Sequence, residues 1–309
     1  MDKPLVTIIT VTRNLKEARR LKHFKKCVNS VHDQTYKNIE HIVIDGASED
    51  GTLDILNKYA ELGWLWYRTE ADAGIYNAMN KGIALAKGKY VAFLNSDDYY
   101  HNKKAVELSV ESLENARADY SYANYRVVGR GQRYTEKAVF DRFICTMPFG
   151  HPTMFTKRSV LLKEEGFDEA LGLPSDYDLV IRLILGGYKP VYVDSLIVSY
   201  RLGGASVTTD YSDDVARIYL KNYSSFFSFS GPEEAKRIFL EKVLPRDFLA
   251  ALESFLKKNR VGGVDIGKTL QAVKASAQFK NLGKKEKFKN ILSHYPMTAI
   301  LIKGVRGKE

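Results

Sequence analysis

The feature that most constrains the fold is an alternation of short apolar runs with helix-like segments over residues 5–94. The apolar runs are rich in β-branched and aromatic residues, as buried strands are, and the segments between them repeat apolar residues every three or four positions. The runs are residues 5–11, 39–44, 64–67 and 90–94, and the helical segments are the stretch ending at His32, residues 52–62 and residues 75–86. This order predicts a Rossmann-like α/β fold with a mostly parallel sheet and flanking helices.

The apolar run at 90–94 is followed by two adjacent carboxylates, Asp97 and Asp98. A strand buried on both faces would place them at the carboxyl edge of the sheet, where open α/β sheets bind their ligands. Two neighbouring carboxylates repel each other, and a cation beside them makes it easier for both to stay ionised. Because Mg²⁺ is commonly held by one or two carboxylates together with substrate phosphates, the pair predicts a divalent-metal site. The alternative is that residues 95–98 form only a polar turn.

Polar side chains also follow the first two predicted strands. Thr10, Thr12 and Asn14 end the first strand, and Asp45 with Gly46 ends the second. The Thr-x-Asn stretch could equally cap the following helix, and Asp45-Gly46 could form an ordinary turn. Since the carboxyl ends of parallel strands meet at one edge, a shared ligand site accounts for these residues together, whereas separate turns do not.

The composition is that of a folded protein with a basic surface. Its 309 residues, 45% of them hydrophobic, suffice for one large domain with an appendage or for two domains. A net charge of +10 suits a phosphorylated substrate, an anionic membrane or a nucleic acid, and does not choose among them. Cys27 and Cys145 form no CxxC pair, so neither zinc nor a disulfide framework is indicated. We see no signal-peptide pattern and no apolar run near the ~20 residues of a membrane span, and we expect a cytoplasmic protein.

Four stretches of the first half resemble the successive motifs of family-2 glycosyltransferases of the GT-A fold. They are TVTRN at 10–14, VIDGASEDGT at 43–52, EADAGIYNAMNKGIALAKGKY at 70–90 and FLNSDD at 93–98. Two later stretches are similar to the acceptor-side half of that family, namely GHPTMFTKR at 150–158 and GFDEALGLPSDYDLVIRLILGG at 166–187. The likeness covers about residues 4–205. It implies a GT-A catalytic domain over 1–205, with a C-terminal helical region over 206–309, of the type that serves bacterial polysaccharide biosynthesis.

The resemblance implies a role for each residue at the predicted sheet edge. Asp45 matches the acid that hydrogen-bonds the nucleotide base, and Asp72 matches a second nucleotide-side acid. Asp97 would face the ribose or the donor sugar, and Asp98 would bind Mn²⁺ or Mg²⁺. Asn95 stands where many relatives carry an acid, so the metal would rest on Asp98, diphosphate oxygens and waters. The expected nucleotide-sugar site is completed by Thr10, Thr12 and Asn14.

On the acceptor side, the resemblance makes Asp176 the catalytic base. Ser175 precedes it where relatives often carry Glu, and an acid that only favours the N-terminus of a helix is the alternative interpretation. Contacts with the acceptor or the diphosphate are weaker expectations for His151, Arg182 and Arg201. For His151 the alternative is a structural hydrogen bond, and for the two arginines it is a solvated surface.

The predicted reaction is an inverting, metal-dependent transfer of a sugar from a nucleotide-diphosphate sugar to a hydroxyl of a glycan or lipid-linked acceptor, in surface-polysaccharide or glycolipid assembly. One alternative is a sugar-nucleotide nucleotidyltransferase, which would show a Gly-rich triphosphate loop where this chain has residues 11–14. Another is a noncatalytic nucleic-acid-binding protein. No RNP, helix-turn-helix or zinc signature stands out, so we expect no nucleic-acid partner.

Residues 283–309 mix lysines with apolar residues, and the lysines include Lys284, Lys285, Lys287 and Lys289. This pattern is typical either of a peripheral contact with an anionic membrane or of a solvated helix packed on the catalytic domain. A lipid-linked acceptor would make a membrane contact useful. The inner face of the membrane is therefore the alternative to a purely cytoplasmic location.

Overall fold

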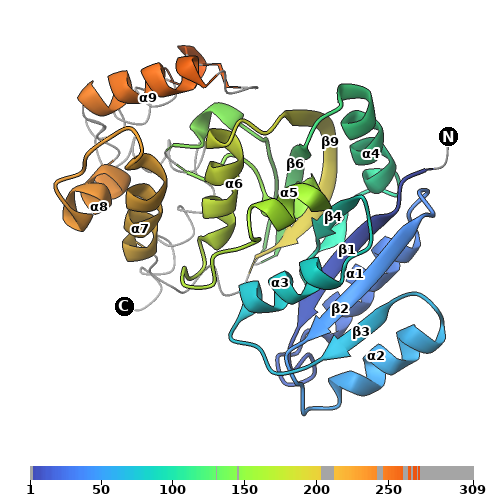
Figure 1. Cartoon of the computed structure of the whole chain (residues 1–309). Coiled ribbons are helices and arrows are strands. Elements are labelled where there is room, and N and C mark those ends of the chain that lie inside the picture. The colour runs from blue at the N-terminus through green and yellow to red at the C-terminus, as the bar shows by residue number, and fades with distance from the viewer. Residues whose placement is uncertain are drawn as a thin grey trace. The chain divides into compact units, whose positions relative to one another are not determined.

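The computed structural model describes residues 3–129, 131–144, 146–202, 212–241 and 246–259, together with 264–265, 267–269 and 271. The chain forms two compact units (Figure 1). The first contains residues 1–138, 149–170 and 188–202, and the second contains residues 139–148, 171–187 and 203–309. All the described strands belong to the first unit.

The described strands form one nine-stranded sheet in the order β3-β2-β1-β4-β8-β6-β9-β5, and β7 pairs with β6. They are β1 (Val6–Thr12), β2 (Ile39–Asp45), β3 (Trp66–Thr69), β4 (Tyr90–Phe93), β5 (Tyr99–Tyr100), β6 (Tyr120–Gly129), β7 (Gln132–Glu136), β8 (Phe155–Lys157) and β9 (Pro190–Arg201). The four strands of the first half pair in parallel, as do β6 and β9. Antiparallel pairing enters with β5, β7 and β8. The predicted mixed α/β fold with a Rossmann-like first half is confirmed.

Helices cover both faces of the first half of the sheet. In the first unit they are α1 (Leu21–His32), α2 (Thr52–Glu61), α3 (Ile75–Leu85), α4 (Ala105–Ala116) and α5 (Arg158–Lys163), with the 3₁₀ turn η2 (His151–Thr153). Apolar side chains of α1, α2 and α4 join the two core clusters on one face. On the other face α3 packs so closely that a Cβ on Gly82 would lie 2.6 Å from Ile9 Cγ2. Such burial on both sides explains why β1 and β4 are apolar at nearly every position.

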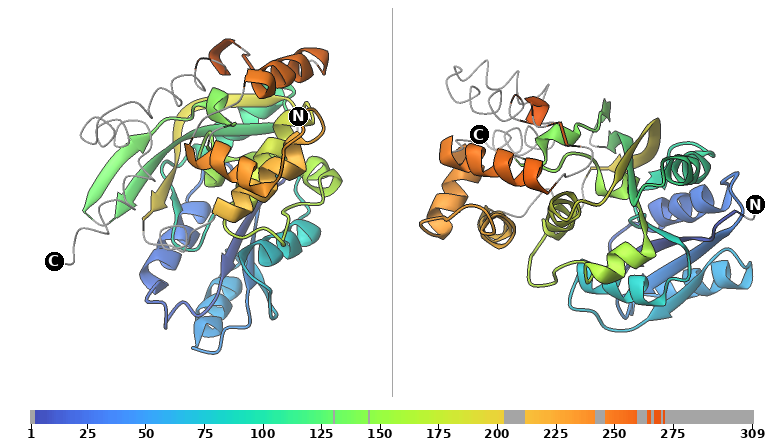
Figure 2. Two further views of the ribbon diagram at one scale, coloured as in Figure 1. Left: turned by 90° about the vertical axis from the view of Figure 1, so that its left-hand side faces the viewer. Right: turned by 45° about the horizontal axis from the view of Figure 1, so that its top comes forward.

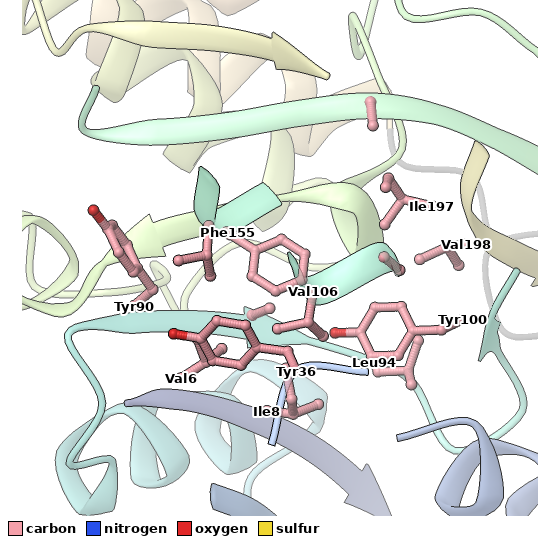
Figure 3. Packing of buried hydrophobic residues seen from close by; sticks show 14 of the residues in the cluster. Val6, Ile8, Tyr36, Tyr90, Leu94, Tyr100, Val106, Phe155, Ile197 and Val198 are labelled. Carbon is pink, nitrogen blue, oxygen red and sulfur yellow. The ribbon is translucent and has the colours of Figure 1, made fainter. Parts of the chain in front are cut away.

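One core cluster lies between the sheet and helices α1 and α4, and Figure 3 shows its packing. Val6 and Ile8 of β1, Tyr90 of β4 and Phe155 of β8 meet Val106 of α4 there, all of them buried. Burial of such side chains is the dominant favourable term in folding, at about 25 cal/mol per Å² of apolar surface. This cluster fixes β4, and with it the start of the segment that carries the two adjacent acids.

Gly88, which lies between α3 and β4, is tightly packed against the backbone of β1. Helix α3 ends at Leu85, capped by Ala86 in an extended conformation. A Cβ on Gly88 would lie 2.5 Å from the backbone nitrogen of Thr7 and 2.7 Å from the carbonyl oxygen of Tyr90. Glycine is therefore required at this position by the close approach of β1 and not by the helix end.

The described part of the second unit is helical. It contains η1 (Phe140–Arg142), α6 (Ser175–Leu185), α7 (Ser212–Tyr223), α8 (Pro232–Glu241) and α9 (Arg246–Lys258). Beyond residue 205 the described residues include α7, α8 and α9, and residues 171–187 belong to the same compact unit. The division into a catalytic domain over 1–205 and a C-terminal helical region over 206–309 stays a prediction. Within the described residues, no helix is long and apolar enough to cross a membrane. Cys27 is buried as a free thiol, whereas Cys145, the segment 203–209 and the lysine-rich residues 283–309 lie outside the described residues.

Candidate active site

The carboxyl ends of the parallel strands bring most of the predicted donor-side residues together. The strand register aligns Thr12 of β1 with Asp45 of β2, and Asp45 with Thr69 of β3. Strand β4 runs parallel to β1 and ends at Phe93, so Asp97 and Asp98 follow at the same edge. All of these residues belong to the first unit, and the expected convergence at one sheet edge is observed.

Asp45 is wholly buried and organises the loop that follows β2. Its carboxylate accepts hydrogen bonds from the backbone N–H of Ser48 at 2.9 Å, from the Ser48 hydroxyl at 2.6 Å and from the Thr69 hydroxyl at 2.8 Å. An ionised carboxylate has about four lone-pair positions, so internal donors use most of them. Asp45 therefore holds the loop at the edge of the candidate site, and a neighbouring side chain is more accessible to a ligand than the Asp45 carboxylate.

Asp72 is that accessible side chain. Its Oδ2 lies only 2.3 Å from the position that a Cβ on Gly46 would occupy, so the carboxylate rests directly against the Gly46 backbone. Its Oδ1 accepts the N–H of Gly74 at 3.0 Å. The side chain of Arg13 lies on the same glycine, with Cδ 3.3 Å from that position. The residue that follows Asp45 is therefore glycine because Asp72 occupies the space of a side chain.

Asn14 joins the loops that follow β1 and β2. Its N–H donates to the Ser48 hydroxyl at 2.8 Å, and its Oδ1 accepts the N–H of Glu49 at 3.1 Å. The helix-cap alternative does not hold, because α1 begins at Leu21 with Arg20 as its N-terminal cap. Asn14 itself adopts a left-handed conformation with φ of 47°, which asparagine tolerates better than most residues.

The two threonines of β1 have different environments. Thr10 is wholly buried, and its hydroxyl lies 3.0 Å from His41 Nε2. Its side chain is therefore packed inside the protein and is not accessible to a ligand. Thr12 is the last residue of the strand, and its buried hydroxyl has no hydrogen-bond partner among the described residues. An unsatisfied buried hydroxyl costs free energy, which a ligand at the strand end would recover. The roles expected of Thr10 and Thr12 in donor binding stay predictions, and the free hydroxyl favours Thr12.

Asp97 and Asp98 follow β4, and Arg201 at the end of β9 contacts both. The guanidinium of Arg201 donates to Asp97 Oδ2 from Nε and Nη2, at 3.2 and 3.0 Å. The backbone N–H of Arg201 donates to Asp98 Oδ1 at 2.8 Å, and Asn95 Nδ2 donates to Asp98 Oδ2 at 3.2 Å. Asp97 thus has a cationic partner, whereas the groups that donate to Asp98 are neutral.

The surroundings of Asp98 fit a divalent cation. Burial, together with the neighbouring Asp97 carboxylate, raises the pKa of Asp98 well above its ordinary range. The buried Oδ1 of Asn95 has no hydrogen-bond partner in the part of the chain that the structure describes. A hard cation would neutralise the carboxylate and accept this amide oxygen as a ligand. The described residues contain no group of three or more His, Cys, Asp and Glu side chains able to hold a metal ion, so donor phosphates and waters would complete the coordination.

His151 begins η2 in an aromatic environment. Its ring stacks on Phe93 with centroids 5.2 Å apart and meets the edge of Phe167 at 5.4 Å. Burial lowers the pKa of His151 to about 4, so the imidazole is neutral at pH 7. A neutral, packed ring serves the structural role that the sequence left open, and a charged contact with a diphosphate does not fit it.

Three residues of helix α6, all in the second unit, bear on the acceptor-side expectations. Asp176, the second residue of the helix, is half-buried, and its Oδ1 accepts the N–H of Tyr177 at 2.8 Å. Asp178 is wholly buried and accepts hydrogen bonds from Arg182 at 2.8 Å, and from Lys221 and Asn222 of α7 at 3.2 and 2.8 Å. Asp178 and Arg182 are thus engaged in holding α6 to α7. Asp176 is the less buried of the two acids.

The sequence did not predict the partners of the acidic side chains. Ser48 and Thr69, which donate to Asp45, carried no signal of their own. Arg201 was expected only as a weak ligand contact, yet its guanidinium donates hydrogen bonds to Asp97, which lies 104 positions earlier in the sequence. The glycine after Asp45 was the one usable clue, because a glycine beside a predicted site residue often marks a close approach.

Comparison with known proteins decides the family. Residues 7–168, more than half of the chain, match Glycosyl transferase family 2. This chain belongs to that family. It is therefore a glycosyltransferase, as the sequence motifs indicated.

Three proteins illustrate the relationship. WfaP of Escherichia coli, named a UDP-Glc:α-D-GlcNAc-diphosphoundecaprenol β-1,3-glucosyltransferase, is 28% identical over 69% of this chain and 83% of its own length. Residues 1–349 of S. aureus TarS, crystallised with UDP-GlcNAc, superpose with a TM-score of 0.62 at 18% identity and cover 89% of this chain and 90% of TarS. The mannosyltransferase PcManGT of Pyrobaculum calidifontis, in complex with GDP-Man and Mn²⁺, gives a TM-score of 0.56 at 19% identity over 100% of this chain and 89% of its own. At these identities the two structures establish the GT-A fold.

Proposed function

We propose that this glycosyltransferase carries out an inverting, divalent-metal-dependent transfer of a sugar from a nucleotide-diphosphate sugar to an acceptor hydroxyl, in the assembly of a surface polysaccharide or glycolipid. The observation that carries the proposal is the state of Asp98, a buried carboxylate with neutral donors and an unpartnered amide oxygen beside it. A site of this kind is incomplete without a cation. Its position at the carboxyl ends of the parallel strands is where α/β sheets bind nucleotides.

The donor nucleotide binds along this edge. Asp72 accepts a hydrogen bond from the base, and Gly46 leaves room for its carboxylate beside the loop that follows β2. Asp45 supports this contact by fixing the loop, and Asn14 ties the same loop to β1. Thr12 supplies its unpartnered hydroxyl.

Asp97 and Asp98, which follow β4, have different roles in the proposed site. Asp97, which forms an ion pair with Arg201, accepts hydrogen bonds from the ribose or the donor sugar. Asp98 and Asn95 Oδ1 would hold the metal ion, Mn²⁺ or Mg²⁺. When bound, the ion neutralises charge that develops on the leaving diphosphate. PcManGT, which shares the fold, is crystallised with Mn²⁺, and this supports a metal in the same class of site.

Asp176 acts as the general base on the acceptor hydroxyl. It takes the proton as the hydroxyl oxygen attacks the anomeric carbon, and the bond to the diphosphate breaks, so the configuration inverts. A positioned carboxylate in this role contributes ~10²–10⁴-fold to the rate. The greater exposure of the Asp176 side chain, compared with the wholly buried Asp178, supports this assignment.

A lipid-linked acceptor is the substrate class that the comparisons support best, since WfaP is named for a diphosphoundecaprenol acceptor. Residues 283–309 would then hold the chain at an anionic membrane surface, with each lysine contributing about 1 kcal/mol at most. Sedimentation with phosphatidylglycerol vesicles tests this. Full-length protein should pellet at low salt and be released at high salt, and removal of residues 283–309 should abolish pelleting.

A donor screen tests the function itself. We expect one sugar nucleotide of a panel to raise the thermal midpoint of the protein, with a larger shift in Mn²⁺ or Mg²⁺ than in chelator. Slow hydrolysis of the same nucleotide in the absence of acceptor should accompany the shift. A protein that binds no sugar nucleotide with either metal would contradict the proposal.

The base is tested by Asp176→Asn, which should lower kcat ~10²–10⁴-fold while the affinity for the donor nucleotide stays within about twofold. The matched control is Asp247→Asn, because Asp247 is also the second residue of its helix and also accepts the N–H of the next residue, at 3.1 Å. If both variants keep normal turnover, Asp176 is only a helix-end acid.

A further inference from the structure

The outer half of the sheet, built by β5, β6, β7 and β9, has two faces of different charge. Successive residues of a strand point to opposite faces, so Tyr134 and Glu136 of β7 share one face with Tyr125 of β6, the residue paired with Glu136. The ring of Tyr125 meets that of Tyr200 of β9 at 6.2 Å. The single carboxylate of β7 therefore lies on the aromatic face.

The opposite face of the same strands carries positive charge. The register places Arg126 of β6 beside both Ser199 of β9 and Thr135 of β7, and the Arg126 guanidinium donates to the Thr135 hydroxyl at 3.3 Å. In the next row of that face, Val128 of β6 separates Arg201 of β9 from Arg133 of β7. Figure 2 shows β6 running between β9 and β7.

Helix α1 and strand β5 add to this basic face. Lys26 of α1 places its Nζ 3.4 Å from the ring centroid of Tyr99, and Tyr99 pairs with Ser199. His101, next to β5, lies with Nδ1 2.8 Å from the Ser199 hydroxyl. Burial lowers the pKa of His101, and Arg126, Arg133 and Lys26 lower it further. The three cations thus act together on one imidazole.

These three cations have no counter-charge among the described residues. Lys26, Arg126 and Arg133 form no ion pair there, whereas Lys3, Lys89 and Lys157 of the same unit each pair with an acid. The buried Nε of Arg126 also has no hydrogen-bond partner. Like charges held together without a counter-ion repel one another and favour the binding of an anion.

We propose that Lys26, Arg126 and Arg133 form a phosphate-binding surface that receives a phosphate or diphosphate group of the acceptor. This proposal rests on the proposed function and names the acceptor class. Arg201 lies in the same row as Arg133, two strands away, and its guanidinium holds Asp97. At ~4.8 Å per strand the two backbones are roughly 10 Å apart. A sugar that carries a phosphate at one end and its reacting hydroxyl at the other bridges a gap of this order.

The cations suit a phosphate by their chemistry as well as their position. Two arginines offer forked N–H donors that match phosphate oxygens, and Lys26 adds a point charge. An anionic lipid headgroup has the same phosphate chemistry, so the test must separate the two sources. The neutral, hydroxyl-only acceptor of an ordinary glycan would leave these charges unused.

The test uses the full-length double variant Lys26→Gln/Arg133→Gln, since both side chains are exposed. Lys58→Gln/Lys87→Gln is the matched control, because it removes two exposed charges from another part of the same unit. Calorimetry with inorganic pyrophosphate in chelator should show binding to the wild type and the control, and about tenfold weaker binding to the Lys26/Arg133 variant, equivalent to 1.4 kcal/mol. Binding should also weaken as salt is added.

A second arm measures pelleting with vesicles of equal parts phosphatidylglycerol and phosphatidylcholine, which should be the same for the double variant as for the wild type. Unchanged pyrophosphate affinity in the variant overturns the proposal. Reduced pelleting with unchanged pyrophosphate affinity also overturns the proposal, because the surface would then bind lipid headgroups. If the double variant unfolds, Arg133→Gln alone replaces it. A protein that binds pyrophosphate through these residues but no sugar nucleotide supports the phosphate surface and contradicts the proposed function instead.

Discussion

Asp98→Asn separates the metal site from the fold, because the structure supplies the new amide with partners. The backbone N–H of Arg201, which now donates to Asp98 Oδ1 at 2.8 Å, can donate to the amide oxygen instead. The amide nitrogen needs an acceptor, and rotation of the Asn95 amide would present its Oδ1, which has no partner at present. The substitution therefore keeps the hydrogen bonds while removing the buried negative charge.

The expected loss is in metal-dependent donor binding. Removing an ionic contact of this kind costs about 1.5–3 kcal/mol. A loss of ~2.7 kcal/mol corresponds to about 100-fold in affinity. At a donor concentration 100 times the wild-type Kd, binding stabilises the wild type by about 2.7 kcal/mol, whereas the variant gains only ~0.4 kcal/mol. In a chain of this size these values correspond to shifts of roughly 5–10 °C and about 1 °C in the thermal midpoint.

Without metal, the variant should differ from the wild type in the opposite direction. A raised folded-state pKa means that the contribution of Asp98 to stability is present below its unfolded value of about 3.9 and is lost as the pH rises through the folded value. At pH 7 the metal-free variant should therefore melt above the metal-free wild type, and the difference should vanish in acid.

Thermal melts with nucleoside diphosphate and Mn²⁺, and with chelator at several pH values, provide both measurements. Asp54→Asn is the control, because it removes the same charge from a side chain that is 80% exposed. Full metal-dependent stabilisation of the Asp98 variant would refute the reasoning and place the ion elsewhere.

Three further substitutions probe the neighbouring residues. Gly46→Ala should push the Asp72 carboxylate aside, because the new Cβ would lie 2.3 Å from its Oδ2. Calorimetry should show donor binding weakened at least tenfold, and denaturant melts should show a change of less than about 1 kcal/mol in the free energy of unfolding. Arg201→Ala should remove the cation that pairs with Asp97 and lower the free energy of unfolding by about 2 kcal/mol. In a metal titration, Mn²⁺ should raise the thermal midpoint of this variant more than that of the wild type. Asp178→Asn should lower the free energy of unfolding by about 3 kcal/mol in urea, because two cations lose their buried partner, and the protein that remains folded should keep its turnover.

The elements of the first half could be predicted because their signals are local. Strands buried on both faces need continuous apolar sequence, and β1 and β4 have it. The carboxyl-edge location of Asp45, Asp97 and Asp98 then followed from parallel pairing alone. The family motifs added a role for each acid, and the family itself is confirmed.

What the sequence could not give are the partners that decide how each polar residue behaves. Thr10 and Thr12 are two positions apart in the same strand, yet one is bonded to His41 beneath the sheet and the other is unpartnered at its end. The compact unit that takes up residues 171–187 is likewise set by long-range packing, since Asp178 is bonded to Lys221 and Asn222 of α7. The spacing of apolar residues in the sequence does not predict which distant side chains form such hydrogen bonds.

The contrast between Asp97 and Asp98 shows how a distant strand sets their chemistry. The two acids are neighbours in sequence, yet their partners differ. The Arg201 guanidinium donates to Asp97, whereas only the Arg201 backbone N–H donates to Asp98, so a cationic side chain pairs with Asp97 and neutral groups donate to Asp98. Strand β9 also carries Ser199, which lies beside Arg126, so the strand whose last residue contacts both acids also borders the basic surface. A change in the register of β9 against β6 would therefore alter both at once.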